Sequence, residues 1–183
     1  GKKGALALER AVHIFSQVLE GVGFAHKYRT IHGDIKPANI LLDRQGRAKV
    51  SDFGLAFLLT CDGRPSHGMP QGGTPCYMSP EQILNQEVDF RSDIYALGVT
   101  LFHMITGQFP TGDRKRHMEL VECHLEGSLE EAEAILSEFE EITPRIEKAI
   151  LKALEPQPDE RHQSCLEFAL AIREDASHEM YSE

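Results

Sequence analysis

The chain has 183 residues and a formal net charge of −10, with 41% hydrophobic and 26% charged residues. This is the composition of an ordinary globular domain, so a disordered or fibrous protein is excluded. Nine glutamates and no lysine or arginine lie between Glu119 and Glu141, and no basic stripe is available to neutralise phosphates. A nucleic-acid partner is therefore not expected, and the acidic run is interpreted as a solvated helix face.

Cysteine usage and hydropathy indicate the compartment. The chain has four cysteines, Cys61, Cys76, Cys123 and Cys165. They show no C-x-x-C spacing and no framework density, which predicts reduced thiols and no thiolate metal site. The longest apolar stretch, Ile94 to Ile105, is too short to span a bilayer, so no membrane segment is expected in this chain. We expect a cytoplasmic protein, or the cytosolic face of a membrane protein if a transmembrane segment flanks the chain.

Hydrophobic periodicity predicts a long amphipathic helix that ends near Tyr28. Its apolar residues recur at helical spacing: Leu8, Ala11, Val12, Phe15, Val18, Leu19, Val22 and Ala25. The sequence IHGDIKPAN then predicts a loop, because Gly33 and Pro37 interrupt any regular element. The segments ILLD and AKVSD, separated by RQG, are predicted to form two short strands joined by a tight turn.

Residues 54–78 are rich in glycine and proline and predict a long loop, which in a compact domain is more often a lid or switch than filler. A short helix is predicted to begin at Ser79. Ser92 is predicted to cap a second long helix that stops at Gly107. Further helices are expected over about 114–124, 129–140, 143–154 (with Thr143 as cap) and 163–175. The expected fold class is α+β and mainly helical, with one small β-hairpin.

Four polar residues lie around the predicted hairpin: Asp34, Lys36, Asn39 and Asp52. Phosphoryl transfer needs metal ions on the phosphates and a carboxylate that orients the incoming hydroxyl, but little covalent help from the protein. Asn39 and Asp52 offer the oxygen ligands that Mg²⁺ prefers. Asp34 is spaced to face an acceptor hydroxyl, and Lys36 to offset charge on the phosphate. Alone, an Asx residue here would indicate a turn; together, the four indicate phosphoryl transfer.

The motifs HGDIKPAN, DFG and GTPCYMSPE follow one another as the catalytic loop, the metal-binding motif and the end of the activation segment do in protein kinases. The chain therefore resembles the C-terminal lobe of a eukaryotic-type serine/threonine protein kinase over essentially all of residues 1–183, and bacterial members of the family have similar strings. The resemblance implies ATP and Mg²⁺ (or Mn²⁺) as cofactors. It also implies a protein substrate with a serine or threonine acceptor and an activation segment over residues 52–81.

The resemblance carries specific roles onto this sequence. It implies catalytic roles for Asp34, Lys36, Asn39 and Thr74. It implies cofactor contacts for Leu41, Lys36, Asn39 and Asp52, and metal ligation for Asn39 and Asp52. By this resemblance, Asp34 would be the catalytic base and Lys36 would neutralise charge on the phosphate. Leu41 would form the floor under the adenine, and Thr74 would brace the catalytic loop.

Supporting contacts are implied as well. His32 and Phe53 would stack in a hydrophobic spine that Asp93 anchors from the second long helix. Glu81 and Arg161 would form a buried ion pair between the activation segment and the late helices. Without the resemblance, Asp93 could simply favour the helix dipole, and nothing in the sequence joins Glu81 to Arg161.

The family also has an N-terminal lobe with a glycine-rich phosphate loop, a strand lysine and a helix glutamate, and none of these is visible in the sequence. We therefore expect residues 1–183 to be the C-terminal lobe alone, most simply a fragment that lacks half of the ATP site. Such a fragment is expected to have little or no kinase activity. A pseudokinase or scaffold lobe is an alternative, which the presence of all four chemical residues opposes.

Gly33 stands where many relatives have an arginine before the catalytic aspartate. HGD is also the pattern of small-molecule kinases similar to aminoglycoside and choline phosphotransferases, which gives a second alternative function. The sequences KPAN and GTPCYMSPE oppose it, because the latter is a platform for peptide substrates. Phe57 likewise stands where the family often adds a second basic group. The prediction is a non-RD kinase that is active without phosphate on Thr60 or Ser66.

Overall fold

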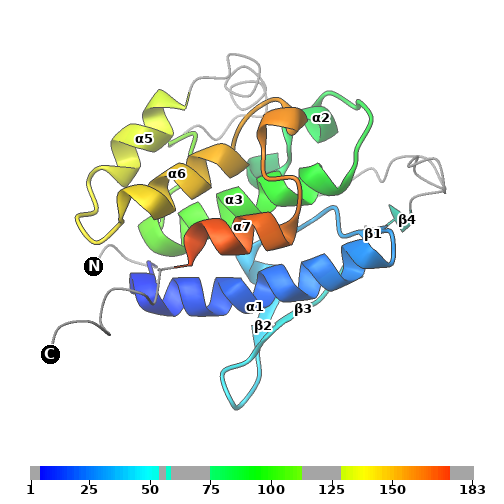
Figure 1. The fold of residues 1–183 in the computed structure, drawn as a ribbon, viewed down its shortest axis with the longest axis horizontal. Helices are drawn as coiled ribbons and strands as arrows, with labels where there is room; N and C mark the ends of the chain where they lie inside the picture. The colour runs from blue at the N-terminus through cyan, green and yellow to red at the C-terminus, as the bar shows by residue number, and fades with distance from the viewer. Residues whose placement is uncertain (1–4, 54–56, 59–74, 113–128, 174–183) are drawn as a thin grey trace, which may run out of the picture.

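The computed structural model describes residues 5–53, 57–58, 75–112 and 129–173, and these ranges are mainly helical, as the sequence predicts. The larger helices are α1 (Leu8–Lys27), α3 (Phe90–Thr106), α6 (Pro144–Ala153) and α7 (Cys165–Ile172). The shorter ones are α2 (Pro80–Ile83) and α5 (Glu130–Leu136). Figure 1 shows α3 in the middle of the molecule, with α1 and α7 along one side of it and α6 along the other. The helix predicted over about 114–124 lies outside the described residues.

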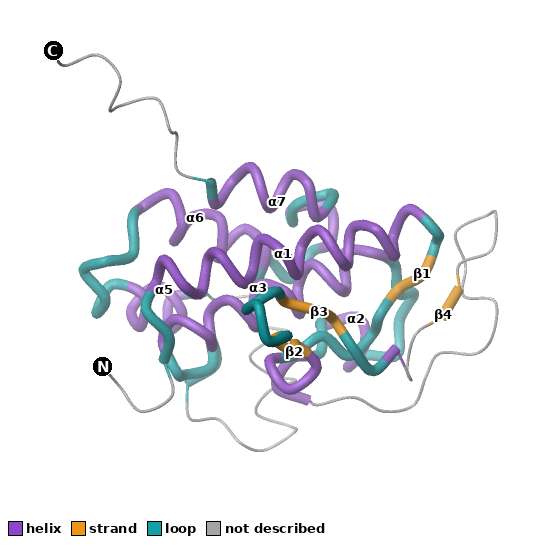
Figure 2. The backbone as a smooth tube through the Cα atoms, turned by 90° about the horizontal axis from the view of Figure 1, so that it is seen from below, coloured by secondary structure: helices purple, strands orange, loops and turns teal. Residues whose placement is uncertain are grey.

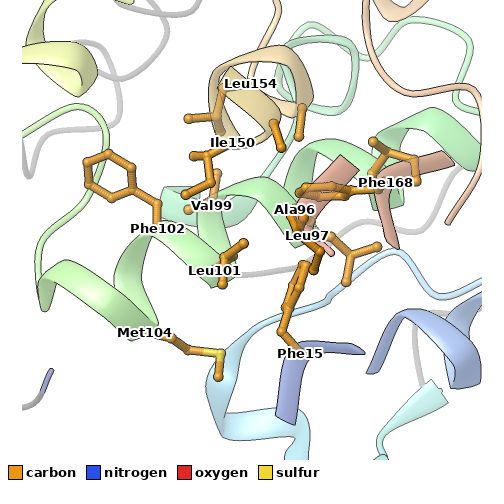
Figure 3. Packing of buried hydrophobic residues seen from close by; sticks show 14 of the residues in the cluster. Phe15, Ala96, Leu97, Val99, Leu101, Phe102, Met104, Ile150, Leu154 and Phe168 are labelled. Atoms are coloured by element: carbon orange, nitrogen blue, oxygen red, sulfur yellow. The ribbon is translucent and has the colours of Figure 1, made fainter. Parts of the chain in front are cut away.

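Helix α3 is the centre of the fold because almost its whole circumference is buried. From Ser92 to Thr106, every residue except His103 is buried. A helix that is apolar all round requires neighbours on every side, and α1 and α6 both pack on α3. Phe15 of α1 and Phe168 of α7 meet edge to face next to Leu97 (Figure 3), with their ring centroids 5.4 Å apart. The polar residues that α3 carries are thus held on a rigid support.

Several predicted helix boundaries are confirmed. Helix α1 ends at Lys27, and Ser79 caps α2 through a capping box with Gln82. Thr143 caps α6, where its side chain accepts a hydrogen bond from the backbone N of Ile146 at 3.4 Å. Helix α3 ends where predicted, at Gly107. At Ser79, Thr143 and Gly107 a residue with a known capping preference stands at the edge of a clear hydrophobic period.

Three boundaries are wrong. Helix α7 ends at Ile172 rather than near residue 175, because the backbone of Arg173 is already extended. Asp89, not Ser92, caps α3, because its carboxylate accepts a hydrogen bond from the backbone N of Arg91 at 2.7 Å. Ser92 lies inside the helix and donates its hydroxyl to Glu81 instead. Helix α5 ends at Leu136 rather than near residue 140, because the following backbone amides bond three residues back as turns, Phe139 N to Leu136 O among them.

The strands form two antiparallel pairs. β2 (Ile40–Leu42) pairs with β3 (Ala48–Val50), with Leu41 opposite Lys49. β1 (Thr30–Ile31) pairs with β4 (Phe57–Leu58). The second pair was not predicted, since strands of two residues give no readable alternation. It joins the chain just before the HGDIKPAN loop to the chain just after the DFG motif, as Figure 2 shows at one end of the molecule.

The expectations about membrane segments and cysteines can be compared with the described residues only. Within the described ranges, none of the helices has the length and apolarity needed to cross a bilayer. Cys76 and Cys165 are free thiols, whereas Cys61 and Cys123 lie outside the described residues.

Candidate active site

Asp34, Lys36 and Asn39 come together in the loop between β1 and β2. The Nζ atom of Lys36 lies 2.6 Å from Oδ2 of Asp34. Asn39 Nδ2 donates to the backbone O of Asp34 at 2.8 Å and to its Oδ2 at 3.3 Å. The loop contains one 3-10 turn, η1 (Pro37–Asn39), and Pro37 at its start fixes φ in the helical range. This turn brings Asn39 back to Asp34.

Asp52 lies two residues after the end of β3 and is linked to the loop through Ser51. The backbone N of Ser51 donates to the backbone O of Asn39 at 2.9 Å, and Ser51 Oγ lies 3.1 Å from Asp52 Oδ2. Asp52 has a φ of 60°, a left-handed conformation that Asp adopts more readily than most residues. Ser51 therefore links Asn39 to Asp52 through its backbone and its hydroxyl.

His32 is buried and connects the loop to β3. Its Nε2 lies 2.9 Å from the backbone O of Ser51, and its Nδ1 lies 3.2 Å from the backbone N of Asp34. Because a carbonyl only accepts and an amide only donates, Nε2 carries a proton and Nδ1 accepts. The predicted contact with Phe53 is confirmed, since the two ring centroids are 4.5 Å apart.

Asp93 of α3 holds the loop through both of its carboxylate oxygens. Oδ1 accepts from the backbone N of Gly33 and Oδ2 from that of His32, each at 2.9 Å. His26 Nε2 lies 2.8 Å from Oδ2. Asp93 is only 1% exposed, and these three partners offset the free energy cost of burying its charge. The predicted anchoring role of Asp93 is thus confirmed in geometry.

Gly33 contributes its backbone to the site. Its φ is 78°, a region where a side chain is strained and glycine is not. Its amide donates to Asp93, and its carbonyl accepts a hydrogen bond from Gln82 Nε2 at 3.0 Å. Gly33 therefore joins the loop that holds Asp34 to both α3 and α2.

The predicted ion pair between Glu81 and Arg161 is confirmed. Arg161 Nη1 and Nη2 each donate to one carboxylate oxygen of Glu81 at 2.8 Å, and both residues are buried. Arg161 also donates to the backbone oxygens of Arg91, Glu155 and Pro156. Burial alone would raise the pKa of Glu81, but the hydrogen bonds and charge of Arg161 hold that pKa below its ordinary value. The pair ties α2 to the segment before α7.

Two predicted site residues, Leu41 and Thr74, have no described contact with this cluster. Leu41 lies in β2 and is 54% exposed. Thr74 lies outside the described residues. The sequence does not identify Ser51 and His26, because nothing in their spacing signals a role: His26 meets Asp93 across 67 residues.

The family model described as the protein kinase domain matches residues 1–171. The chain therefore belongs to the protein kinase domain family.

Among curated relatives, the serine/threonine-protein kinase PknB of Mycolicibacterium smegmatis is 34% identical over 167 residues, which are 90% of this chain and 26% of that protein. Pkn1 of Myxococcus xanthus is 36% identical over 172 residues, which are 92% of this chain and 24% of that protein. PknF of Mycobacterium tuberculosis is 36% identical over 165 residues, which are 87% of this chain and 33% of that protein. The chain thus spans about a quarter to a third of the length of these relatives.

Proposed function

We propose that this chain is the C-terminal lobe of an enzyme that transfers the γ-phosphate of ATP to serine or threonine side chains of proteins. The observation that carries the proposal is the hydrogen-bonded cluster of Asp34, Lys36 and Asn39. A carboxylate, an ammonium group and an amide within one loop are the parts that phosphoryl transfer requires of the protein. The similarity to three serine/threonine-protein kinases supports the acceptor class.

In the proposed reaction, Asp34 orients the acceptor hydroxyl. It takes the hydroxyl proton as the new oxygen–phosphorus bond forms and the bond to the leaving ADP breaks. Lys36, 2.6 Å from Asp34, supplies positive charge where the transferred group carries negative charge. Asn39 Nδ2 donates to the backbone O of Asp34 and to its Oδ2, and these bonds hold the backbone and the carboxylate of Asp34 in place before the substrate arrives, which lowers the cost of orienting it.

The donor set fits Mg²⁺ or Mn²⁺. In the described contacts, both side-chain hydrogen bonds of Asn39 use Nδ2, so its amide oxygen would be the atom that binds a cation. Asp52 adds a carboxylate. Two oxygen ligands from the protein are typical of Mg²⁺ sites in which substrate phosphates and waters complete the shell. A bound metal neutralises charge on the phosphates.

We propose that Leu41 contacts the adenine and that an N-terminal lobe covers this face. Leu41 and Phe53 are 54% and 40% exposed, and large exposed apolar residues near an active site are typical of surfaces that a ligand or another domain covers. The proposed lobe would supply the glycine-rich loop and the lysine for the phosphates. Residues 52–81 would be the activation segment, most of which lies outside the described residues.

The test uses the protein expressed from its complete reading frame, with Mg-ATP and a generic protein substrate. We expect phosphoserine or phosphothreonine after acid hydrolysis, and a rate at least about 100-fold lower for Asp34→Asn. Asp43→Asn, in the β2–β3 turn, is the control and should keep the parent rate. Phosphotyrosine as the main product, or efficient phosphorylation of an aminoglycoside or choline, would contradict the proposal. Nucleotide binding without transfer would favour a scaffold.

We also propose that the enzyme is of the non-RD type. Gly33 brings no charge beside Asp34, and Phe57 lies in β4 opposite Ile31, so neither position supplies a cation for a phosphate. A dephosphorylated enzyme with Thr60→Ala and Ser66→Ala should therefore keep the rate of the parent. A collapse of that rate, while the phosphorylated parent stays active, would show that phosphate-dependent ordering operates.

A further inference from the structure

A cavity of about 610 Å³ opens between α1, the start of α3 and the start of α7. Figures 1 and 2 both show α1 and α7 side by side there. Its apolar lining includes Leu19, Phe24, Phe90, Leu166 and Ala169, none of which belongs to the site around Asp34. Small-molecule pockets typically have volumes of about 300–1,000 Å³ and mostly apolar, partly aromatic walls. The cavity has the dimensions and lining of such a pocket.

The charges around the cavity restrict what it can hold. Glu20 and Lys27 are exposed at its rim and have opposite signs, so together they contribute no net charge. Burial raises the pKa of the Cys165 thiol, which therefore stays protonated and uncharged at neutral pH. Phe24 and Phe90 offer aromatic surface, against which a flat ring packs favourably. A neutral aromatic molecule of two or three rings fits these walls better than an ion does.

His26 connects the cavity to the loop that holds Asp34. It lines the cavity, where its Nδ1 lies 3.7 Å from Cys165 Sγ. Its Nε2 lies 2.8 Å from Oδ2 of Asp93, and Oδ1 of Asp93 accepts from the backbone N of Gly33 at 2.9 Å. Two hydrogen bonds thus separate the cavity wall from the residue before Asp34. A ligand that packs on His26 and shifts its ring changes a partner of Asp93.

We propose that this cavity is a regulatory site for a small neutral aromatic molecule, and that its occupancy is transmitted through His26 and Asp93 to the loop that holds Asp34. The regulatory meaning rests on the proposed kinase function. Binding and its effect on the loop do not, so they are tested without any activity measurement.

Binding is tested with 6-propionyl-2-(dimethylamino)naphthalene, a neutral two-ring fluorophore whose emission shifts to the blue in apolar surroundings. It is titrated into the 183-residue protein and into two variants of α7. Leu166→Ser removes an exposed wall residue of the cavity. Leu170→Ser removes another exposed leucine, one turn later, that does not line the cavity. We expect saturable binding that is about tenfold weaker in Leu166→Ser, the loss of part of one leucine contact, and unchanged in Leu170→Ser.

These variants also decide where the probe sits, because Leu41 and Phe53 present a second exposed apolar surface. Equal affinity of both serine variants and the parent would place the probe elsewhere and overturn the proposal. So would tighter binding of the anionic analogue 1-anilinonaphthalene-8-sulfonate, since the class of ligand would then be wrong.

Transmission is tested by the amide resonances of ¹⁵N-labelled protein during the same titration. We expect the signals of His32 and Gly33 to move in proportion to occupancy in the parent and in Leu170→Ser. At the same probe concentration they should move less in Leu166→Ser. Saturation of the cavity with no change at His32 and Gly33 would overturn the regulatory link.

Discussion

Gly33 is held by its backbone at a conformation that other residues adopt only with strain. Its φ is 78°, its amide donates to Asp93, and its carbonyl accepts from Gln82. The sequence alone gives an electrostatic reason for this glycine: it places no positive charge beside Asp34. The structure adds a conformational reason, because a Cβ atom at this φ crowds the backbone. Both reasons act on the same position of the loop.

Replacing Gly33 by alanine should therefore lower the free energy of unfolding by about 1 kcal/mol or somewhat more. Gly21→Ala is the matched control, since Gly21 lies within α1 and a Cβ there would meet only Val50 Cγ2, at an ordinary 3.7 Å. Helix propensity predicts that Gly21→Ala is neutral or stabilising by up to about 1 kcal/mol. Urea denaturation of both variants measures the difference. Equal losses in the two would show that the backbone conformation of Gly33 carries no penalty.

The sequence identifies single residues where chemistry limits the residue type. It indicates Asp34, Lys36 and Asn39 because phosphoryl transfer needs a carboxylate, a cation and an oxygen ligand, and the structure brings these three together. Ser51 and His26 act through a hydroxyl, a backbone amide and a ring nitrogen, which serve many roles in proteins. Their partners are fixed only by the fold, so no local pattern identified them.

The sequence predicts where the helices lie, but it does not predict the tertiary contacts that decide where each helix begins or ends. Ser92 and Asp89 are both good capping residues three positions apart, and periodicity alone does not choose between them. The choice is made by Glu81, which draws the hydroxyl of Ser92 away from the helix end. The strand pair β1–β4 shows the same limit, because Thr30 and Leu58 meet only after the intervening chain has folded.

The buried pair of Glu81 and Arg161 should make stability depend on pH. Arg161 and Ser92 hold the pKa of Glu81 below its ordinary value of 4.5 despite burial. A carboxyl group with a depressed folded-state pKa contributes stability above its unfolded-state pKa and loses it as the pH falls through the folded-state value. Glu81→Gln should therefore lower the free energy of unfolding by about 3–5 kcal/mol at pH 7, because Arg161 is left buried and unpaired. The difference from the parent should shrink below about pH 4.5.

Glu167→Gln is the control for this experiment. Glu167 bonds Lys152 at 2.7 Å, but both side chains are about 40% exposed, and exposed pairs contribute about 1 kcal/mol or less. Urea unfolding at several pH values from 7 to about 3 measures both variants. A loss for Glu81→Gln no larger than that for Glu167→Gln would show that the buried pair is not a main support of α2.

Over the whole molecule, α3 determines where the site is. Its Asp93 binds His32 and His26, which precede it by 61 and 67 residues, while Glu81 meets Arg161 across 80 residues. The sequence predicts each helix from spacings of three and four residues, so contacts at these separations are beyond its reach. The anchoring role of Asp93 and the Glu81–Arg161 ion pair are implied only by the resemblance to protein kinases. Neither follows from the spacing of residues in this sequence.

Because the loop is fixed to the most buried helix, it should open only when the molecule unfolds. The amides of His32 and Gly33 donate to Asp93, which is 1% exposed. The amide of Gln45 donates to Asp43 in the exposed turn between β2 and β3. Native-state hydrogen exchange should therefore give opening free energies for His32 and Gly33 close to that of global unfolding, and a much smaller value for Gln45. Gly33 exchanging as fast as Gln45 would mean that the loop opens locally and that α3 does not hold it ready for substrate.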